Sequence, residues 1–319
     1  MSEATIQVKV TRRHEQGQGV VVLDLSTVDG TDLPSFSAGA HVDVHLGGGL
    51  VRPYSLASDP GERSYYRLGI LKDPNSRGGS FAVHEQLHEG TEVTIGVPRN
   101  HFPLEMAAPH SILAGGGIGI TPMIAMAHQL QSAGKSFELH YCARSRASAA
   151  FLDELAASAF AARVHLHFDD EGPAQRFDLP AAITAAGTDS HLYVCGPAGF
   201  MESVIDDAGR LGLPASQIHK EYFQVKTEAG GDAFDVVIRK SGQRVRVQAG
   251  QSIVDALAGI GIRISVSCEQ GVCGTCLCNV IDGTPDHRDV YLTDEEKADN
   301  DQILLCCSRS KSETLVLDL

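Results

Sequence analysis

Hydrophobic and polar residues alternate in short segments through the first hundred residues of the chain. Such alternation places apolar side chains on one face of a strand and polar side chains on the other. Turn-forming residues, among them Asp59-Pro60-Gly61, separate the segments. Many short strands at this spacing predict an antiparallel β-barrel or sandwich. The expected strands are residues 6–10, 20–25, 41–46, 66–71 and 92–97.

From residue 111 onward the pattern changes to apolar strand-like segments that alternate with alanine-rich stretches of helical periodicity. Regular alternation of strand and helix is typical of a doubly wound α/β domain with a parallel sheet. The expected strands are residues 111–114, 138–142, 164–168 and 191–195, and the expected helices are residues 122–133, 149–157 and 199–211.

A polar, glycine-containing run at residues 226–231 has the character of a linker. After it come two strand-like segments at 235–239 and 245–247, a helix-like segment at 253–258 and a loop rich in cysteine. The pattern therefore predicts three domains. Their expected boundaries are residues 1–105, 106–226 and 232–319.

Length and charge narrow the range of functions. The chain has 319 residues, enough for two or three domains with cores of their own. Its 40 Asp and Glu outnumber its 26 Lys and Arg, and the formal charge of −14 disfavours nucleic acid and anionic membranes as partners. The N-terminal residues lack the apolar run of a signal peptide, so we expect a cytoplasmic protein. The apolar residues 111–127 contain four glycines and a proline, too short and broken a run to span a bilayer.

The cysteines gather at the C-terminal end, where six of the eight lie in the last 52 residues. Cys268, Cys273 and Cys276 have the spacing C-x-x-x-x-C-x-x-C, and Cys306 follows after 29 intervening residues. This is the ligand spacing of a plant-type [2Fe–2S] cluster. Zinc is the alternative, although structural zinc usually uses two short-spaced pairs and this loop holds one. We therefore expect an iron–sulfur cluster in the last domain.

The residues next to these four cysteines refine the expected site. Cys306 and Cys307 are adjacent and both qualify as the fourth ligand, but the spacing favours Cys306. Cys278 and Cys307 are expected to pack in the core. Gly271 and Gly274 leave room where the backbone wraps the cluster, and amide groups there can donate to its sulfur atoms.

A candidate flavin motif, Arg52-Pro53-Tyr54-Ser55, lies in the strand-rich region, and Gly78-Gly79-Ser80 begins 23 residues after Ser55. An arginine can pair with a phosphate, a tyrosine can stack on an aromatic ring, and a serine can hydrogen-bond a ring nitrogen. A Gly-Gly-Ser turn can present amide protons to a phosphate. The alternative is a strand with an exposed arginine and an unrelated flexible turn.

A glycine-rich segment, Gly115-Gly116-Gly117-Ile118-Gly119-Ile120-Thr121-Pro122, predicts a turn between a strand and a helix. Thr121 is expected to cap this helix and Pro122 to be its first residue. The helix N-terminus would then offer backbone amides to a pyrophosphate. Ile120 stands where a dinucleotide fingerprint has its last glycine, so a turn used only for packing is the alternative. Cys195-Gly196-Pro197 follows the last expected strand, where open α/β sheets bind ligands.

The R-x-Y-S strand, the glycine turn, the GGGIGITP segment and the CGP motif follow one another as in the ferredoxin–NADP reductase superfamily, which the chain resembles. With a ferredoxin-like region at its C-terminus, the whole chain resembles the phthalate dioxygenase reductase family. The resemblance implies an FMN-binding antiparallel β-barrel, an NAD-binding α/β domain and a plant-type ferredoxin domain of β-grasp fold. FMN rather than FAD rests on this resemblance, because the residues named would bind either flavin.

The resemblance also implies roles for the residues of the flavin motif. Arg52 would bind the flavin phosphate, Tyr54 would stack on the flavin, and Ser55 would meet the N5 edge of the ring. Gly79 and Ser80 would contact the phosphate. Each of these roles is an expectation that depends on how the strand and the turn are placed relative to each other.

For the nicotinamide domain, the resemblance implies that the Cys195 thiol lies near the nicotinamide ring. Glu221 and Phe223 match the segment that ends this domain and packs against the flavin, although Phe223 could also be a core aromatic. Pro53, within the R-x-Y-S motif, should be tolerated on an edge strand. The candidate catalytic residues are Ser55, Cys195 and Phe223.

The sequence gives conflicting indications about the 2′ position of the nicotinamide cofactor. A dinucleotide site usually presents a carboxylate to a free ribose about 20 residues after its glycines. The matching strand end here is Cys142-Ala143-Arg144-Ser145-Arg146, which has none. Arg144 and Arg146 could hold a 2′-phosphate, which favours NADPH, whereas the resemblance implies NADH. We expect NADH.

Nicotinamide delivers two electrons as hydride and a [2Fe–2S] cluster accepts one at a time, so a flavin is the expected converter. The resemblance implies that the electrons pass to a Rieske-type oxygenase that hydroxylates or O-demethylates aromatic compounds. Glu269, Asp286, Arg288 and Asp289 are the expected docking rim. The alternative acceptors are a diiron hydroxylase, a cytochrome or a small molecule. The chain is expected to act as a monomer.

Overall fold

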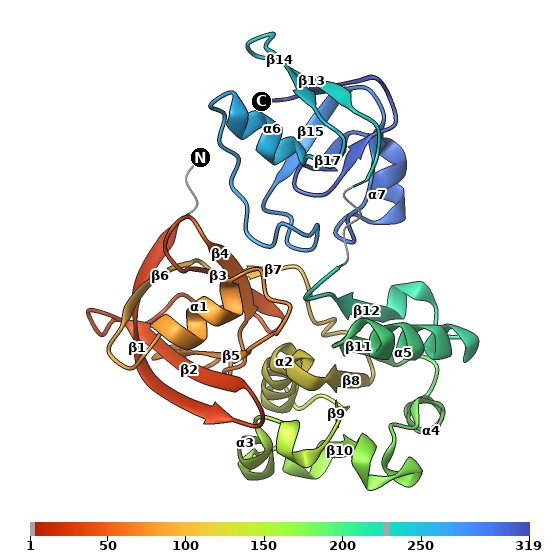
Figure 1. Ribbon diagram of the computed structural model, residues 1–319. Coiled ribbons are helices and arrows are strands. Elements are labelled where there is room, and N and C mark those ends of the chain that lie inside the picture. Colours follow the sequence, from red (N-terminus) through yellow and green to blue (C-terminus); the bar gives the residue numbers. More distant parts are fainter. Residues whose placement is uncertain (1–3, 226–229) are drawn as a thin grey trace. The chain divides into compact units, whose positions relative to one another are not determined.

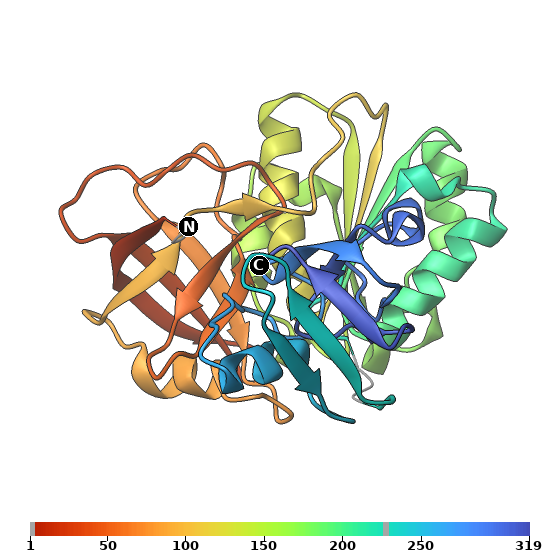
Figure 2. The ribbon, with the colours of Figure 1, turned by 90° about the horizontal axis from the view of Figure 1, so that it is seen from above.

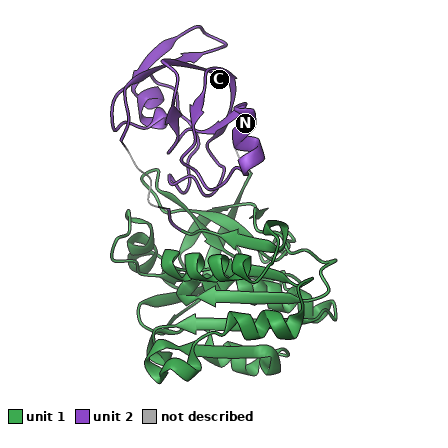
Figure 3. Cartoon of the chain, turned by 90° about the vertical axis from the view of Figure 1, so that its right-hand side faces the viewer, with its two compact units in different colours: residues 1–223 green, residues 224–319 purple. Residues whose placement is uncertain are grey.

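The computed structural model describes residues 4–225 and 230–319, and its elements are labelled in Figure 1. The chain divides into two compact units, residues 1–223 and 224–319, coloured separately in Figure 3. Part of the predicted linker, residues 226–229, lies outside the described residues. Within the described residues, no helix has the length and apolar character needed to cross a membrane.

Unit 1 begins with a seven-stranded antiparallel sheet in the order β4-β3-β6-β1-β2-β5, with β7 paired to β3. Leu56, just after β4, makes one isolated antiparallel bridge with Leu68 of β5, so the two end strands meet at a single point. Helix α1 (Gly79–Gln86) buries Ala82 and Val83 in the core of this sheet. The strands are β1 (Thr5–Gln16), β2 (Val20–Thr27), β3 (Ala40–His45), β4 (Val51–Ser55), β5 (Tyr66–Leu71), β6 (Glu92–Gly96) and β7 (Arg99–Asn100).

Strand β2 is buried from Val20 to Leu25 rather than on alternate residues. Val21, Leu23 and Leu25 face the core of the antiparallel sheet, whereas Val20 and Val22 belong to a second core that includes helix α2. This strand is buried on both faces because protein covers both of them, and its buried Asp24 pairs with Arg67. The alternation pattern alone predicts one buried face and one solvated face.

The second half of unit 1 is a five-stranded parallel sheet in the order β10-β9-β8-β11-β12. Helix α2 packs between this sheet and the antiparallel sheet, and α4 and α5 cover the other face (Figure 2). The strands are β8 (Ser111–Gly116), β9 (Phe137–Ala143), β10 (Val164–Phe168), β11 (His191–Cys195) and β12 (Ile218–Glu221). The helices are α2 (Ile120–Ser132), α3 (Leu152–Ala157), α4 (Leu179–Ala186) and α5 (Ala198–Arg210).

Unit 2 has a mixed five-stranded sheet in the order β14-β13-β19-β15-β17, in which β13 and β19 are parallel. Helix α6 packs Ile253, Ala256 and Leu257 into its core. This arrangement is the expected β-grasp. The strands are β13 (Phe234–Ile238), β14 (Arg244–Val247), β15 (Leu277–Asp282), β16 (Pro285–Asp286), β17 (Gln302–Leu304), β18 (Arg309–Ser310) and β19 (Thr314–Leu317), and the helices are α6 (Ile253–Gly259) and α7 (Asp294–Asp299).

The predicted fold class is confirmed: an antiparallel sheet, a doubly wound parallel sheet and a β-grasp occur in the expected order. Two α-helices and two strands of unit 1 were not predicted, namely α1, α4, β7 and β12. Helix α4 starts with Leu179-Pro180 after an Asp178 side chain that accepts the Ala181 N–H, a capping signal that the periodicity does not register. The predicted boundary near residue 105 falls inside unit 1 and stays a prediction.

Candidate cofactor sites

The R-x-Y-S strand and the glycine turn lie next to each other in unit 1. The Arg52 guanidinium donates to the Arg77 carbonyl at 3.1 Å and to the Val51 carbonyl at 2.7 Å. A Cβ added to Gly79 would lie 2.5 Å from Cγ of Arg52. Gly78, at φ 91°, precedes α1, whose N-terminus has no side-chain cap. The first backbone amide of α1, at Gly79, lies next to the Arg52 side chain, and this arrangement suits the phosphate of FMN.

Ser80 takes part in the same turn through internal bonds. Its hydroxyl accepts the Asp73 N–H at 3.1 Å, and its own N–H donates to the Ser76 hydroxyl at 3.2 Å. The side chain is buried. Ser80 therefore shapes the turn, and its hydroxyl, which acts as an acceptor there, keeps a proton to donate; its contact with the phosphate stays a prediction.

The remaining residues of the motif lie along β4. This strand is at the end of the sheet order, so Pro53 stands on an edge strand as expected. Tyr54 packs at the margin of the antiparallel core, and burial raises the pKa of its hydroxyl. Ser55 is buried and donates to Oε2 of Glu221 at 3.2 Å. Residues 166 positions apart are thus joined at one point.

Glu221 ends β12 and lies directly beside Cys195 of β11 in the parallel register. Burial raises the pKa of the Glu221 carboxyl to about 8, against a smaller lowering by the Ser55 hydrogen bond. Near neutral pH this carboxyl therefore holds a proton. Burial, together with the nearby Glu221, also raises the pKa of the Cys195 thiol well above its usual value.

Cys195 and Phe223 both pack into protein. Cys195 has no exposed surface and belongs to the core that contains α2. Phe223 is half-buried and packs against the same core. This packing is compatible with the alternative that Phe223 is a core aromatic residue. The structure therefore brings Ser55, Glu221 and Cys195 together, with Phe223 packed against the core to which Cys195 belongs.

The helix after the glycine turn starts differently from the prediction. A 3₁₀ turn at Gly117–Gly119 precedes α2, and Gly119, not Thr121, occupies the N-cap position. The predicted cap is wrong because the glycine turn already winds helically, so that Thr121 is the second residue of the helix. The Thr121 hydroxyl donates to the Ile118 carbonyl at 3.0 Å, and the residue is buried.

Most glycines of the turn serve close packing. A Cβ on Gly119 would lie 2.3 Å from the carbonyl oxygen of Cys195, and one on Gly115 would lie 2.9 Å from Cα of Ile120. A Cβ on Gly196 would lie 2.9 Å from Cα of Gly116. Gly117, at φ 55°, has nothing within 4 Å of an added Cβ. The two turns fit against each other without side chains, and Gly117 is the glycine of the turn around which space is open.

Pro197 and Phe200 line the other side of Gly116, where an added Cβ would lie 3.0 Å from Cδ of Pro197 and 2.7 Å from the Phe200 ring. Phe200 is on α5, three residues after the CGP motif. Nothing in the spacing of the motif singles this residue out. It is a packing partner of the glycine turn that the sequence analysis missed.

The strand end expected to bind the 2′ position also holds unpredicted carboxylates. Arg144 is exposed, whereas Arg146 contacts Glu171 at 3.4 Å and lies over the Phe168 ring. The Asp170 N–H donates to the Arg144 carbonyl at 3.2 Å. The acidic turn Asp169–Glu171 follows β10, which pairs in parallel with β9, so both strand ends meet at one edge. A carboxylate next to Arg144 comes from the neighbouring strand rather than from β9.

In unit 2 the cysteine loop surrounds its sulfur atoms with amide donors. The N–H groups of Gln270 and Val272 each lie 3.4 Å from the Cys268 sulfur, and the Cys268 N–H lies 3.5 Å from the Cys273 sulfur. The Cys268 side chain interacts with those of both Cys273 and Cys306. Amide donors of this kind favour negative charge on sulfur, as the ligands of a cluster require.

The glycines and remaining cysteines of unit 2 pack tightly. Gly271 and Gly274 have φ of 73° and 72°; an added Cβ would lie 2.5 Å from the Cys307 sulfur and 2.4 Å from the Tyr291 ring, respectively. Cys278 and Cys307 are buried in the core, whereas Cys306 is partly exposed. In the described residues, no three His, Cys, Asp or Glu side chains are arranged to hold a single metal ion.

The expected docking rim is wrong in part. Asp289 is 4% exposed and faces the interior, because its carboxyl group accepts internal hydrogen bonds. Asp286 and Arg288 form an ion pair with each other at 2.7 Å. Glu269 is exposed, at φ 54° in the cysteine loop. Of the four predicted residues, Glu269 is the one whose side chain is fully on the surface.

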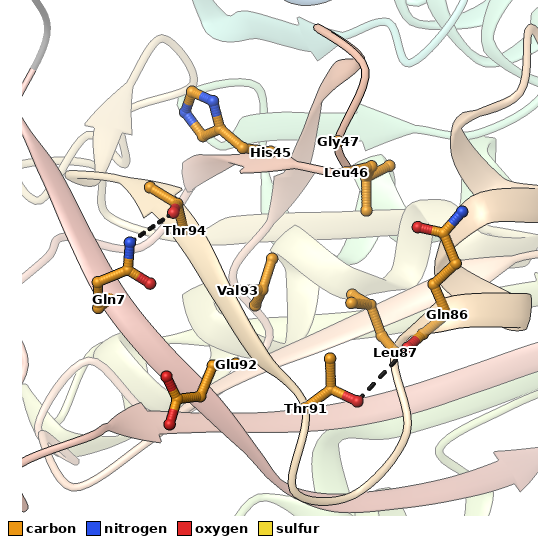
Figure 4. Close-up of a pocket in the computed structure, with 10 residues that line it drawn as sticks. All are labelled: Gln7, His45, Leu46, Gly47, Gln86, Leu87, Thr91, Glu92, Val93 and Thr94. Carbon is orange, nitrogen blue, oxygen red and sulfur yellow. Dashed lines mark hydrogen bonds between the residues drawn. The ribbon is translucent and has the colours of Figure 1, made fainter.

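A pocket of about 270 Å³ lies elsewhere, between β3, β6 and the end of α1 (Figure 4). None of the predicted cofactor residues lines it. Its lining is mostly polar or charged, with Glu92, His45 and two threonines among its residues. The candidate cofactor sites are therefore defined by motifs and close packing rather than by this pocket.

Comparison with known proteins identifies an NAD-binding domain and a 2Fe-2S cluster-binding domain in this chain. A family model for the 2Fe-2S iron-sulfur cluster binding domain matches residues 236–311, and one for the oxidoreductase NAD-binding domain matches residues 113–206. The vanillate O-demethylase oxidoreductase of Pseudomonas sp. (strain HR199 / DSM 7063) is 49% identical over 98% of this chain and 100% of its own length.

Solved structures agree with these matches. Phthalate dioxygenase reductase superposes with a TM-score of 0.76 at 36% identity, over 99% of this chain and 98% of that one. An intact type IV self-sufficient cytochrome P450 monooxygenase gives 0.86 at 37% identity, over 99% of this chain, which spans about two fifths of that protein (41%). The chain therefore belongs to the phthalate dioxygenase reductase family, oxidoreductases that use NADH, FMN and a [2Fe–2S] cluster.

Proposed function

We propose that the chain is the reductase component of a Rieske-type oxygenase system that demethylates or hydroxylates an aromatic compound. The observation that carries this proposal is the match to vanillate O-demethylase oxidoreductases along the whole chain, at 49% identity. Bound FMN would accept hydride from NADH and release electrons singly to the cluster. The residues of the chain would bind and orient these groups. Glu221, next to Ser55, would hold a proton beside the flavin.

For FMN, Arg52 and the uncapped N-terminus of α1 at Gly78 and Gly79 would hold the phosphate, and Tyr54 would stack on the ring. Ser55 would meet the ring edge with Glu221 behind it, 3.2 Å from its hydroxyl. Because the Glu221 carboxyl has a pKa of about 8, it can keep a proton there at neutral pH. Ser55 and Glu221 would keep this proton or release it as the charge on the bound flavin changes.

For NADH, the amide groups around Gly117 would meet the pyrophosphate, with Gly115 and Gly116 packing the turn. The Cys195-Gly196-Pro197 turn would adjoin the nicotinamide, and Phe223 would close the site. The acidic turn Asp169–Glu171 beside Arg144 favours ribose hydroxyls over a 2′-phosphate through charge repulsion. This supports NADH rather than NADPH as the donor.

The cluster would be held by Cys268, Cys273, Cys276 and Cys306. Cys306 is preferred to Cys307 because its side chain interacts with that of Cys268, whereas the Cys307 sulfur packs against Gly271. We further propose that the domains span residues 1–105, 106–226 and 232–319, and that the chain acts as a monomer. Size-exclusion chromatography with light scattering tests the monomer.

The oxygenase would dock on the exposed surface next to the cysteine loop. Val290, 38% exposed, donates its N–H to the Gly271 carbonyl at 3.1 Å, and Leu277, 37% exposed, donates its N–H to the Gly274 carbonyl at 2.9 Å. Glu269, in the same cysteine loop, is exposed and adds a negative charge. This surface, the pair Val290 and Leu277 with Glu269, replaces the charged rim that the sequence analysis expected.

A cytochrome acceptor is the second candidate, because the chain resembles about two fifths of a self-sufficient cytochrome P450. The deciding experiment is anaerobic titration of the purified protein with NADH and with NADPH, followed by addition of an aromatic O-demethylase oxygenase or a P450. Bleaching of flavin and cluster bands by NADH, then turnover with the oxygenase, supports the proposal. A colourless protein, or turnover with the P450 alone, would overturn it.

A further inference from the structure

Asp289 is a buried carboxylate that the cofactor roles above do not use. It lies in unit 2 between β16 and α7 and is 4% exposed. Its Oδ2 accepts the Leu292 N–H at 2.9 Å, and its Oδ1 accepts the Ser308 hydroxyl at 3.3 Å. A buried carboxylate is costly unless it is hydrogen-bonded, so these contacts are what keep it in the interior.

One side of Asp289 supports the cysteine loop. A Cβ added to Gly271 would lie 2.9 Å from both Cα and Cβ of Asp289. The next residue, Val290, donates its N–H to the Gly271 carbonyl at 3.1 Å. Gly271 stands between Cys268 and Cys273, so this segment holds the middle of the loop that carries three of the four proposed ligands.

The other side of Asp289 supports the segment that carries Cys306. Ser308 follows Cys306 by two residues and is 1% exposed. Its hydroxyl donates to Oδ1 of Asp289 and accepts the Arg288 N–H at 3.2 Å. Asp289 thus touches both cysteine-bearing segments, which are about thirty residues apart in the sequence.

The charged groups that face Asp289 come from its own segment and from α7. The Lys297 ammonium donates to the Asp289 carbonyl at 2.9 Å, and Nδ1 of His287 lies 3.7 Å from its Oδ1. The lysine binds the backbone oxygen rather than the carboxylate. The carboxylate is held mainly by neutral donors, the Leu292 amide and the Ser308 hydroxyl.

We propose that Asp289 is a positioning residue that keeps the Cys268–Cys276 loop and the Cys306 segment in register around the cluster, and that its buried charge lowers the reduction potential there. The inference rests on the proposed ligand set. Reduction adds negative charge to a cluster, so a carboxylate beside it in a low-dielectric interior opposes reduction. Hydrogen bonds and charges around the ligands are among the means by which a protein sets such a potential.

Two substitutions separate the two parts of this role in the full-length protein. Asp289→Ala removes both the charge and the acceptor for Leu292 and Ser308. Asp289→Asn removes the charge but keeps an oxygen that can accept the Leu292 N–H. Asp286→Asn is the matched control, since Asp286 lies three residues away and pairs with Arg288 on the margin of the same segment.

The readouts are iron and acid-labile sulfide per chain, the electron paramagnetic resonance spectrum of the reduced cluster, and its midpoint potential. We expect Asp289→Ala to lose at least half of its iron and sulfide, and Asp289→Asn to keep them with a more positive potential and an altered spectrum. The control should match the wild type in all three. Reduction of ferricyanide by NADH, which needs only the flavin, should be unchanged in every variant.

Wild-type iron content in Asp289→Ala, or an unchanged potential and spectrum in Asp289→Asn, would overturn the inference. A shift of the same size in Asp286→Asn would also overturn it, because the effect would not be specific to the buried carboxylate. Absence of an iron–sulfur spectrum from the wild-type protein would instead overturn the proposed function, on which this inference rests.

Discussion

The two cofactor regions hold their loops by different physical means. In unit 1 the glycine turn and the Cys195-Gly196-Pro197 turn pack backbone against backbone, with an added Cβ on Gly119 only 2.3 Å from a carbonyl oxygen. In unit 2 the Asp289 carboxyl accepts hydrogen bonds from Leu292 and Ser308, and the next residue, Val290, donates its N–H to Gly271 of the cysteine loop. Packing of bare backbone excludes any added atom, whereas a hydrogen-bonded support fails when a donor or acceptor is removed. The two regions should therefore respond to opposite kinds of substitution.

The largest expected effect is in unit 2, at the adjacent cysteines. Cys306→Ser should abolish the iron–sulfur absorbance and most of the iron, because it removes a thiolate ligand. Cys307→Ser should keep the cluster, since Cys307 is buried against Gly271 and is not a proposed ligand. Iron analysis and visible absorption of both variants check this. Loss of the cluster in Cys307→Ser alone would reverse the assignment.

The Ser55–Glu221 contact is where unit 1 depends on a buried polar group, and it predicts a pH dependence. The folded pKa of Glu221, about 8, lies above the ordinary value of 4.5 that the unfolded chain has, so the unfolded chain loses this proton first. Stability should therefore fall as pH rises from about 4.5 to about 8, by up to about 1.4 kcal/mol per pH unit. Above pH 8 this contribution should level off.

Urea unfolding of Glu221→Gln at pH 5.5 to 8.5 should show a flatter dependence on pH than the wild type, because the amide does not titrate. Glu202→Gln, a change on exposed α5 surface, is the control and should keep the wild-type slope. Equal slopes for Glu221→Gln and the wild type would show that this carboxyl titrates normally in the folded protein.

Backbone packing in unit 1 predicts a contrast between two glycines. Gly119→Ala should lower the free energy of unfolding by about 1–3 kcal/mol or more, because its Cβ overlaps the Cys195 carbonyl. Gly117→Ala should cost about 1 kcal/mol, from its positive φ alone, since nothing lies within 4 Å. Denaturant unfolding measures both. A larger loss in Gly117→Ala than in Gly119→Ala would contradict the packing role.

The smallest expected effect is on the choice of nicotinamide. Changing Asp169 and Asp170 to Asn should raise kcat/KM for NADPH by roughly threefold to tenfold, since exposed charges each contribute only about 0.3–1 kcal/mol. Arg144→Ala should lower the same quantity for NADPH and leave NADH nearly unchanged. Steady-state kinetics with both donors check this. Unchanged NADPH kinetics in the double variant would show that the acidic turn does not affect the choice between NADH and NADPH.

Much of the fold was predictable because its signals are local. The spacing from Cys268 to Cys276, the alternation in the first hundred residues and the strand–helix repeat after residue 111 are each carried by neighbouring residues. Features created by the fold were not predictable in this way. The two-sided burial of β2 and the capping start of α4 are examples.

The same distinction applies to the candidate sites. Glu221 was identified by resemblance, but its hydrogen bond to Ser55 depends on contact between residues 166 positions apart. The Asp169–Glu171 turn was missed because it reaches Arg144 from the neighbouring strand. Asp289 was placed on the surface because it is charged, whereas hydrogen bonds to Leu292 and Ser308 keep it inside.

Strand β2 has a consequence for how unit 1 unfolds. Val21 and Leu23 belong to one core and Val20 and Val22 to the other, so one strand contributes to both. Separating the antiparallel and parallel halves would expose an apolar face on each, which opposes their independent unfolding. Residues 1–223 should therefore behave as one cooperative unit in native-state hydrogen exchange, even though they contain two sheets.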